Sequence, residues 1–347
     1  MSFELPPDPR AERRTRIGQW VGFGFATLLV VLIAYLAYVG YEGSRQLTDH
    51  PDPSSDCRTP AVFGWTYEAI NYPIETDATL QAEEDPTDCA AQGAPAGEDL
   101  TSADGTRLAG WYIPSGSETG PTGPTVVLVH GWGSNKSAML DQAAVLHEQY
   151  NVLIVDLRNH GQSEAAATTQ GVREASDVEA FVDWLDTTKA PKQIALFGVS
   201  MGGVTVLNEA DSDERIEAVI IESTHATMAN AIQARLEQAG YPLSLPGSWA
   251  VLLGTLVRTG QDVSSADAVQ AIARLDERPV LIVSGGQDDT IGENDAADLL
   301  AAAEEAGSPA ELDVCEEAGH AESLEVCPED YPGWMLGFLE RVLALAG

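Results

Sequence analysis

The stretch Gly198-Val199-Ser200-Met201-Gly202 lies between an apolar run, residues 194–197, and a run that favours helix, residues 204–210. A serine in a G-x-S-x-G pattern between a strand and a helix occupies a tight turn, which pushes its hydroxyl out above the edge of the sheet. The turn brings two backbone segments together, so the residues two before and two after the serine must be small. A glycine-rich turn without catalytic function has the same pattern, so the partners of Ser200 decide between the two interpretations.

Short apolar runs alternate with helix-favouring runs on both sides of this stretch. The apolar runs are residues 125–130, 151–156, 194–197, 218–222, 280–284 and 311–315. The first five are rich in Val, Ile and Leu, as expected of strands that are buried on both faces. The helix candidates are residues 136–148, 173–187, 201–210, 295–306 and 331–345. This alternation predicts an α/β fold whose central, mostly parallel sheet is flanked by helices.

Two further segments extend this plan. Asp104-Gly105 predicts a hairpin turn between residues 100–102 and 108–113. The connection from 222 to 280 is longer than one crossover needs, and its surplus helices predict a small cap at about 225–275. We expect one or two of the cap's apolar residues to line a substrate pocket, while the others pack on the sheet. The candidates are Leu243, Leu245, Trp249, Leu252, Leu253 and Leu256.

A serine hydroxyl needs a base that takes its proton and an acid that orients the base. His320 follows the last strand candidate, and Asp288 follows the strand before it. The order Ser200, Asp288, His320 is the one expected for a nucleophile on this kind of turn. Each residue follows a strand, so the three loops open on the same edge of a parallel sheet. Asp289 and Glu222 are alternative acids.

These motifs together resemble the α/β-hydrolase-fold superfamily over residues 98–347. They are His130-Gly131-Trp132-Gly133, residues 156–163, the serine turn, Gly285-x-x-Asp288 and Gly319-His320. Within the superfamily the chain is similar to the BEM46-like and serine aminopeptidase-like branch of membrane-associated hydrolases. The resemblance implies an oxyanion hole made of the backbone N–H groups of Trp132 and Met201.

Other residues of these motifs are open to two interpretations. The Gly-x-x-Asp spacing favours Asp288 over Asp289 as the acid. His130 and His160 are expected to hydrogen-bond to turns, and the Trp132 side chain either lines the acyl pocket or only packs. His225 starts the cap and either approaches the site or lies away from it.

The N-terminal part predicts a membrane anchor. Residues 17–41 hold no charged side chain, and 25 residues exceed the roughly 20 that cross a bilayer as a helix. Trp20 at one end and tyrosines at the other suit the two interfaces, and the arginines before the run predict a cytoplasmic N-terminus. A cleaved signal peptide is the alternative, but no small-x-small site is evident.

The chain therefore divides into four expected parts. Residues 1–16 form a cytoplasmic segment and residues 17–41 a transmembrane helix. Residues 42–97 form a linker, over 42–56, and a cysteine-containing extension. Residues 98–347 form the hydrolase domain, which lies outside the cytoplasm.

The four cysteines are Cys57, Cys89, Cys315 and Cys327, and none belongs to a C-x-x-C motif. We expect no metal site and two disulfides formed in an oxidising compartment. Three pairings are possible, and the sequential one, Cys57–Cys89 and Cys315–Cys327, is our prediction. The second bridge would bracket His320 and hold the loop that presents it.

The net charge of −36, with only three lysines, argues against nucleic acid as a main partner. It suits a protein that stays soluble, including at high salt. The sequence thus predicts a membrane-anchored serine hydrolase that acts on a small or medium carboxylic ester without cofactor or metal. A peptidase, a thioesterase, an acyltransferase and a catalytically silent binding protein are the alternatives.

Overall fold

The computed structural model describes residues 9–49, 58–70, 99–116 and 120–343. Within these ranges nine strands form one sheet in the order β1-β3-β5-β4-β6-β7-β8-β9, with β2 paired to β3. The neighbours from β5 to β9 are parallel, whereas β3 runs antiparallel to β1, β2 and β5. The strands are β1 Glu68–Ile70, β2 Leu100–Thr101, β3 Arg107–Ile113, β4 Thr125–Val129, β5 Asn151–Asp156, β6 Ile194–Val199, β7 Ile216–Glu222, β8 Val280–Gly285 and β9 Ala310–Cys315.

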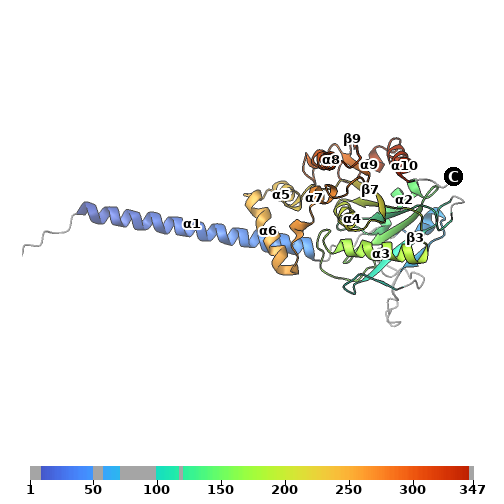
Figure 1. Cartoon of the computed structure of the whole chain (residues 1–347). Coiled ribbons are helices and arrows are strands. Elements are labelled where there is room, and N and C mark those ends of the chain that lie inside the picture. Colours follow the sequence, from blue (N-terminus) through green and yellow to red (C-terminus); the bar gives the residue numbers. More distant parts are fainter. Residues whose placement is uncertain (1–8, 50–57, 71–98, 117–119, 344–347) are drawn as a thin grey trace, which may run out of the picture.

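Helices cover both faces of the sheet, which confirms the predicted α/β-hydrolase fold (Figure 1). They are α1 Pro9–Thr48, α2 Leu140–Leu146, α3 Glu174–Thr188, α4 Met201–Ser212, α5 Met228–Gln238, α6 Ser244–Thr259, α7 Ala268–Ile272, α8 Asp295–Ala306, α9 Ser323–Val326 and α10 Tyr331–Val342. Three short 3-10 helices are η1 Pro60–Phe63, η2 Lys136–Met139 and η3 Val263–Ser265.

Alternation along each strand divides the core into two layers. In β4, Val127 and Val129 pack with α3, α4, α7 and α8 on one face. Val126 and Leu128 face the other way and pack with α2 and α10. All five residues of β4 are buried, as the apolar run predicts for a strand with helices on both faces.

The first helix differs from the prediction at its end. α1 continues as one helix to Thr48, so the expectation of a linker beginning at residue 42 is wrong for residues 42–48. One face of this part is packed, because Ser44 and Thr48 are buried, whereas Arg45 and Gln46 on the other face are exposed. The Thr48 carbonyl accepts a hydrogen bond from the Thr168 N–H at 3.2 Å, which ties the end of α1 to the hydrolase body.

Glycines let α1 and α6 touch backbone to backbone. A Cβ added at Gly40 would lie 2.6 Å from the Ala250 carbonyl oxygen, and one at Gly254 would lie 2.4 Å from the Gly40 carbonyl oxygen. Any larger residue would push the helices apart. The contact between α1 and the cap therefore depends on these two glycines.

The rest of α1 projects away from the hydrolase body (Figure 1). By length and composition, the stretch Gln19–Thr48 is apolar enough to cross a membrane, and its most apolar window is not buried. This is the property on which the prediction of a membrane span over residues 17–41 depends.

The cap is helical, as predicted, but none of the six apolar residues that are candidates for the pocket wall lines the cavities near Ser200. Leu243, Leu245, Trp249, Leu253 and Leu256 are exposed. Of the six expected residues, Leu252 is the buried one. The reason is that α1 and α5 occupy the inner face of α6, so its other apolar face points outward.

A buried acid in α4 gives the fold a measurable pH dependence. Glu209 is 3% exposed, and its Oε1 atom has no hydrogen-bond partner among the described residues. Burial and, second, the charge of Asp213 raise the pKa of Glu209 from 4.5 to about 8. Because the folded pKa is above the unfolded one, the unfolded chain loses this proton first as pH rises. The stability that the protonated carboxyl confers is present below about pH 4.5 and is lost toward pH 8.

We therefore expect Glu209→Gln to flatten this dependence. The midpoint of thermal unfolding should fall less between pH 5 and pH 8 in Glu209→Gln than in the wild-type chain, since a glutamine carries no proton to lose. Glu214→Gln, which changes a nearby exposed acid, is the control and should follow the wild-type curve. Parallel curves for all three proteins would contradict the prediction.

Candidate active site

Ser200 occupies a strained turn between β6 and α4. Its φ of 55° and ψ of −118° lie outside the regions that non-glycine residues favour, at a cost of about 1–3 kcal/mol. A Cβ at Gly198 would lie 2.2 Å from the Gly202 carbonyl oxygen, and one at Gly202 would lie 2.3 Å from that of Val129. The prediction that both positions must be small is confirmed, and the reason is direct backbone contact.

Three predicted residues meet above the carboxyl ends of β6, β8 and β9. The His320 Nε2 atom lies 3.0 Å from the Ser200 Oγ atom. The His320 Nδ1 atom lies 2.8 Å from the Asp288 Oδ2 atom. The alternative acid Asp289 takes no part, because its Oδ2 atom accepts a hydrogen bond from the Gln238 side chain at 3.1 Å.

The surroundings of Asp288 favour its charged form. The side chain is 2% exposed, and its Oδ1 atom accepts a backbone N–H of Thr290 at 3.0 Å. Burial opposes ionisation, but the hydrogen bonds from His320, Thr290 and Ser223 hold the pKa of Asp288 below its usual range. A charged Asp288 accepts the His320 Nδ1–H, which leaves Nε2 to accept the Ser200 hydroxyl proton.

Ser223 is a positioning residue that the sequence analysis missed. It follows β7 with a positive φ of 50°. Its Oγ atom accepts the Ala321 N–H at 2.9 Å, and its hydroxyl also bonds to the Asp288 carboxylate. Ser223 thus links the loop that carries Asp288 to the loop that carries His320.

Glu222, the second alternative acid, lies beneath this group. Its Oε2 atom accepts the Tyr331 hydroxyl at 2.8 Å. The carboxyl is buried, and burial raises its pKa. Its hydrogen-bond partners are the Tyr331 hydroxyl and the backbone of Ser323, so it does not serve as the acid that orients His320.

The loop expected to hold the oxyanion lies beside Ser200, since a Cβ at Gly131 would be 3.2 Å from the Ser200 Cβ atom. Two buried histidines hold this loop, which confirms their predicted role in turns. His130 Nδ1 donates to the Gly131 carbonyl at 2.7 Å, and His160 Nε2 accepts the Gly133 N–H at 3.2 Å. Burial and the neighbouring His160 lower the pKa of His130 to about 4, so it stays neutral.

Buried ion pairs fix the segment that follows β5. Lys136 pairs with Asp156, and both side chains are buried. Arg158 pairs with buried Asp177 at 2.6 Å. The second pair is connected to the 131–133 loop, because His160, which accepts the Gly133 N–H, donates its Nδ1–H to the Arg158 carbonyl at 2.8 Å.

One small cavity adjoins Ser200, and a second adjoins the first. The first has a volume of about 30 Å³ and is lined by Ser200, Met201 and His225, among others. The second has a volume of about 120 Å³ and is lined mainly by α1, α5 and Val251 of α6. They share four residues: Leu47, Trp132, Ile232 and Arg235.

Two interpretations left open by the sequence are resolved by these cavities. The Trp132 side chain lines both of them, and His225 lines the first. His225 is buried without a partner for its Nε2 atom among the described residues, and burial lowers its pKa to about 4. Leu47 and Arg235 were not anticipated, because their place at the site depends on how α1 and α5 pack and on no local motif.

A disulfide bond joins Cys315 and Cys327, as predicted. The two residues bracket His320 in the chain. The predicted partners Cys57 and Cys89 lie outside the described residues. In the parts of the chain that the structure describes, no group of three or more His, Cys, Asp or Glu side chains is placed to hold a metal ion.

Residues 126–332 match the family described as "Alpha/beta hydrolase family", so the chain belongs to this family. An uncharacterized protein of Escherichia coli strain K12, YfhR, is 33% identical over 151 residues, which cover 42% of this chain and 52% of the relative. An uncharacterized protein of Mycobacterium tuberculosis is 29% identical over 225 residues, 63% of this chain and 72% of the relative. The match thus spans about half the length of the Escherichia coli protein.

Solved structures show the same fold. An esterase of Pyrococcus furiosus superposes with a TM-score of 0.64 at 22% identity, over 85% of this chain and 100% of the other. The α/β hydrolase GrgF from Penicillium superposes with a TM-score of 0.54 at 24% identity, over 71% and 98% of the two chains. The narrower resemblance to the BEM46-like branch stays a prediction.

The disulfide is expected to restrain the loop that carries His320. The double variant Cys315→Ala/Cys327→Ala should lose about 2–4 kcal/mol of stability, as is typical for such a bridge. In hydrogen exchange, amides of residues 316–322 should exchange faster than in the wild-type chain. Amides of β4, in the centre of the sheet, serve as the internal control. A lower unfolding temperature with unchanged exchange in 316–322 would show that the bridge stabilises the fold without restraining His320.

Proposed function

We propose that this protein is a membrane-anchored serine hydrolase that cleaves carboxylic esters through an acyl-enzyme. The observation that carries the proposal is the unbroken hydrogen-bond chain from Asp288 through His320 to Ser200. It joins a nucleophile, a base and an acid in the order that nucleophilic catalysis requires.

The reaction has two halves. As the Ser200 Oγ atom attacks the ester carbonyl carbon, its proton passes to His320 Nε2, and the charge of Asp288 stabilises the imidazolium. The carbonyl electrons move to oxygen, where the N–H groups of Trp132 and Met201 would donate hydrogen bonds. The tetrahedral intermediate then expels the alcohol, which takes the proton from His320. In the second half water attacks the acyl carbon and gives a proton to His320. The new tetrahedral intermediate then expels the Ser200 oxygen, which takes that proton back from His320 as the acid leaves.

The two N–H groups are suitable donors. Met201 is the first residue of α4, where a helix leaves its N–H groups without partners inside the helix. Trp132 follows Gly131, where an added Cβ would lie 3.2 Å from the Ser200 Cβ atom. The partial positive charge at the start of α4 also favours the developing oxyanion.

Esters of small or medium acids are the substrates that we favour, since the cavity beside Ser200 is small. The structural likeness to an esterase is consistent with this choice. Peptidase, thioesterase and acyltransferase reactions use the same intermediate, so they are the alternatives. Hydrolysis of ester, thioester and amide versions of one acyl group, with and without a competing alcohol, separates them.

We also propose that residues 17–41 cross the cell membrane with the N-terminus in the cytoplasm. The apolar length of α1 supports the span, and the arginines at positions 10–16 support the orientation. The Cys315–Cys327 bond supports an oxidising compartment for the hydrolase domain, residues 98–347 with its cap. In this proposal α1 continues beyond the membrane span to Thr48, so residues 42–48 are helical and the linker begins after them.

A fluorophosphonate probe tests the mechanism on the full-length chain, because Leu47 of α1 lines the cavity. Labelling is expected at Ser200, identified by mass spectrometry, and is expected to vanish in Ser200→Ala and His320→Ala. Asp288→Asn should lower ester turnover by about 10³–10⁴-fold, since it removes the charge that orients and stabilises His320.

Asp289→Asn is the matched control, as it makes the same change one residue away and should retain wild-type turnover within about twofold. No labelling of well-folded wild-type protein would overturn the hydrolase mechanism and leave a binding protein as the better proposal. An equal loss in both aspartate variants would overturn the assignment of Asp288.

A further inference from the structure

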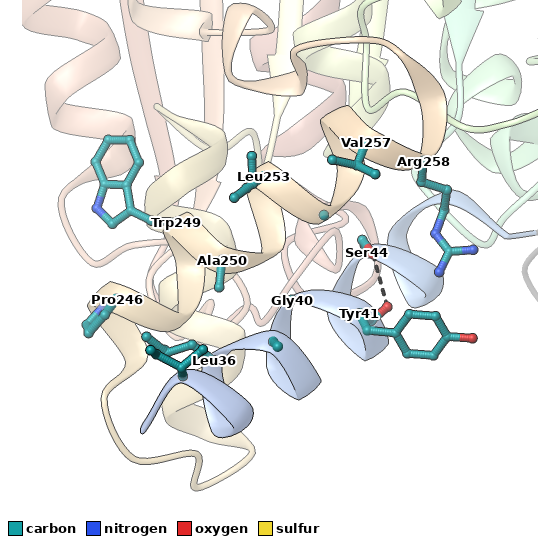
Figure 2. Close-up of a pocket in the computed structure, with 13 residues that line it drawn as sticks. Leu36, Gly40, Tyr41, Ser44, Pro246, Trp249, Ala250, Leu253, Val257 and Arg258 are labelled. Carbon is teal, nitrogen blue, oxygen red and sulfur yellow. Dashed lines mark hydrogen bonds between the residues drawn. The ribbon is translucent and has the colours of Figure 1, made fainter. Parts of the chain in front are cut away.

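A groove of about 810 Å³ runs between α1 and α6 on the outside of the protein (Figure 2). Its walls are apolar along most of their length, with Leu36 from α1 and Trp249, Leu253 and Val257 from α6. It is separate from the cavities beside Ser200, with which it shares no lining residue. In Figure 1, α6 lies at the end of the hydrolase body from which the free part of α1 projects.

The outer face of α6 is unusually apolar for this protein. Trp249 is 62% exposed, Leu253 61% and Val257 80%. Arg258 is the single charged residue of α6, in a chain with 54 acidic residues. A surface helix in contact with water would carry charges on this face. Contiguous exposed apolar surface of this kind marks an interaction site.

We propose that the outer face of α6 lies in the bilayer surface, with Trp249, Leu253 and Val257 inserted among the lipid acyl chains beside α1. The occupant is lipid because the patch is continuous with the exposed apolar side chains of α1, which include Ile33. Polar groups stand at one end of the groove, where Arg258 lies 5.3 Å from the centre of the Tyr41 ring. Tyrosine and arginine are residues that favour the headgroup level.

The proposal goes beyond a single-helix anchor. It makes the cap a second, interfacial contact with the membrane, of the kind that buries an apolar helix face by about 5–10 Å. Because α6 also packs on α5, whose residues line the catalytic cavities, this contact places those cavities at the membrane surface.

The test uses full-length protein in phosphatidylcholine vesicles whose acyl chains carry bromine, which quenches nearby tryptophan. Bromine should quench less fluorescence in Trp249→Phe than in wild type. This difference should be larger when the bromine lies near the headgroup than when it lies near the end of the acyl chain. Trp334→Phe, on α10, which packs against α2 and not against α6, is the control and should remove none of the quenched part. Equal quenching losses in the two variants, or a quenched signal unchanged by Trp249→Phe, would overturn the proposal. Loss of a stable dimer in Leu253→Glu together with that unchanged signal would assign the face to a second copy instead.

An independent observation concerns Arg235 of α5, which lines both cavities beside Ser200. Its guanidinium carbon lies 5.7 Å from the centre of the Trp132 ring. Among the described residues no carboxylate forms an ion pair with it, although the chain has three times as many acids as bases. The residue is exposed, so its guanidinium is open to solvent and to a ligand, while the protein atoms around it lower its pKa by desolvation.

A guanidinium held this way matches a carboxylate or phosphate group. The geometry points to substrates that carry such an anionic group, bound by Arg235 while Ser200 attacks the ester carbonyl. This inference rests on the proposed function, since it names the substrate class of the same site.

Two measurements on the full-length chain test the role of Arg235. The first compares kcat/KM for a matched pair of nitrophenyl esters, hydrogen glutarate and methyl glutarate. Wild type should prefer the anionic ester by at least about tenfold, Arg235→Gln should abolish the preference, and Arg235→Lys should restore part of it. An unchanged preference in Arg235→Gln would overturn the inference.

The second measurement needs no catalysis and so separates a failure of this inference from a failure of the proposed function. In the Ser200→Ala background, glutarate or phenyl phosphate should raise the thermal unfolding temperature, and Arg235→Gln should abolish the rise. The two ligands distinguish a carboxylate site from a phosphate site. No rise with either ligand would overturn the inference.

Discussion

Close backbone contact around Ser200 is the constraint on which the rest of the structure depends. The glycines at 198 and 202 bring the first turn of α4 against the end of β6 and against the end of β4. The chain passes from β6 to α4 through the single residue Ser200. The contacts on both sides hold this residue in a strained backbone conformation. The parallel neighbours β7, β8 and β9 then end at the same level, and their loops bring Ser223, Asp288 and His320 to the serine.

Buried ion pairs hold the loops near Ser200 in place in this acid-rich chain. Two of its few basic residues are buried in ion pairs, Lys136 with Asp156 and Arg158 with Asp177. Breaking a buried pair of this kind leaves an uncompensated charge, so each pair enforces one arrangement of the chain. Most of the remaining acids face solvent, where they repel one another and are screened by salt.

The sequence predicts much of the fold and of the candidate site because the informative signals are local. Apolar runs mark the strands of the parallel sheet, and residues just after three of these strands meet at one edge. Ser200, Asp288 and His320 follow from this rule, and so does the choice of Asp288 over its neighbour. Ser223 and Arg235 could not be predicted in the same way, because their partners come from distant segments. The end of α1 is mispredicted for a related reason: its polar residues are typical of a linker, but α6 and the loop at 168–170 bury two of them, Ser44 and Thr48.

α1 connects its exposed apolar stretch to the cavity beside Ser200 as one uninterrupted helix. The same continuous helix that carries the apolar stretch also supplies Leu47 to the cavity wall beside Ser200. An α-helix turns by about 100° and rises by about 1.5 Å with each residue. Whatever holds the apolar part of α1 therefore sets both the height and the facing direction of Ser200. One residue inserted in the middle of the helix would rotate the hydrolase domain by about 100° and shift it by about 1.5 Å relative to the apolar part.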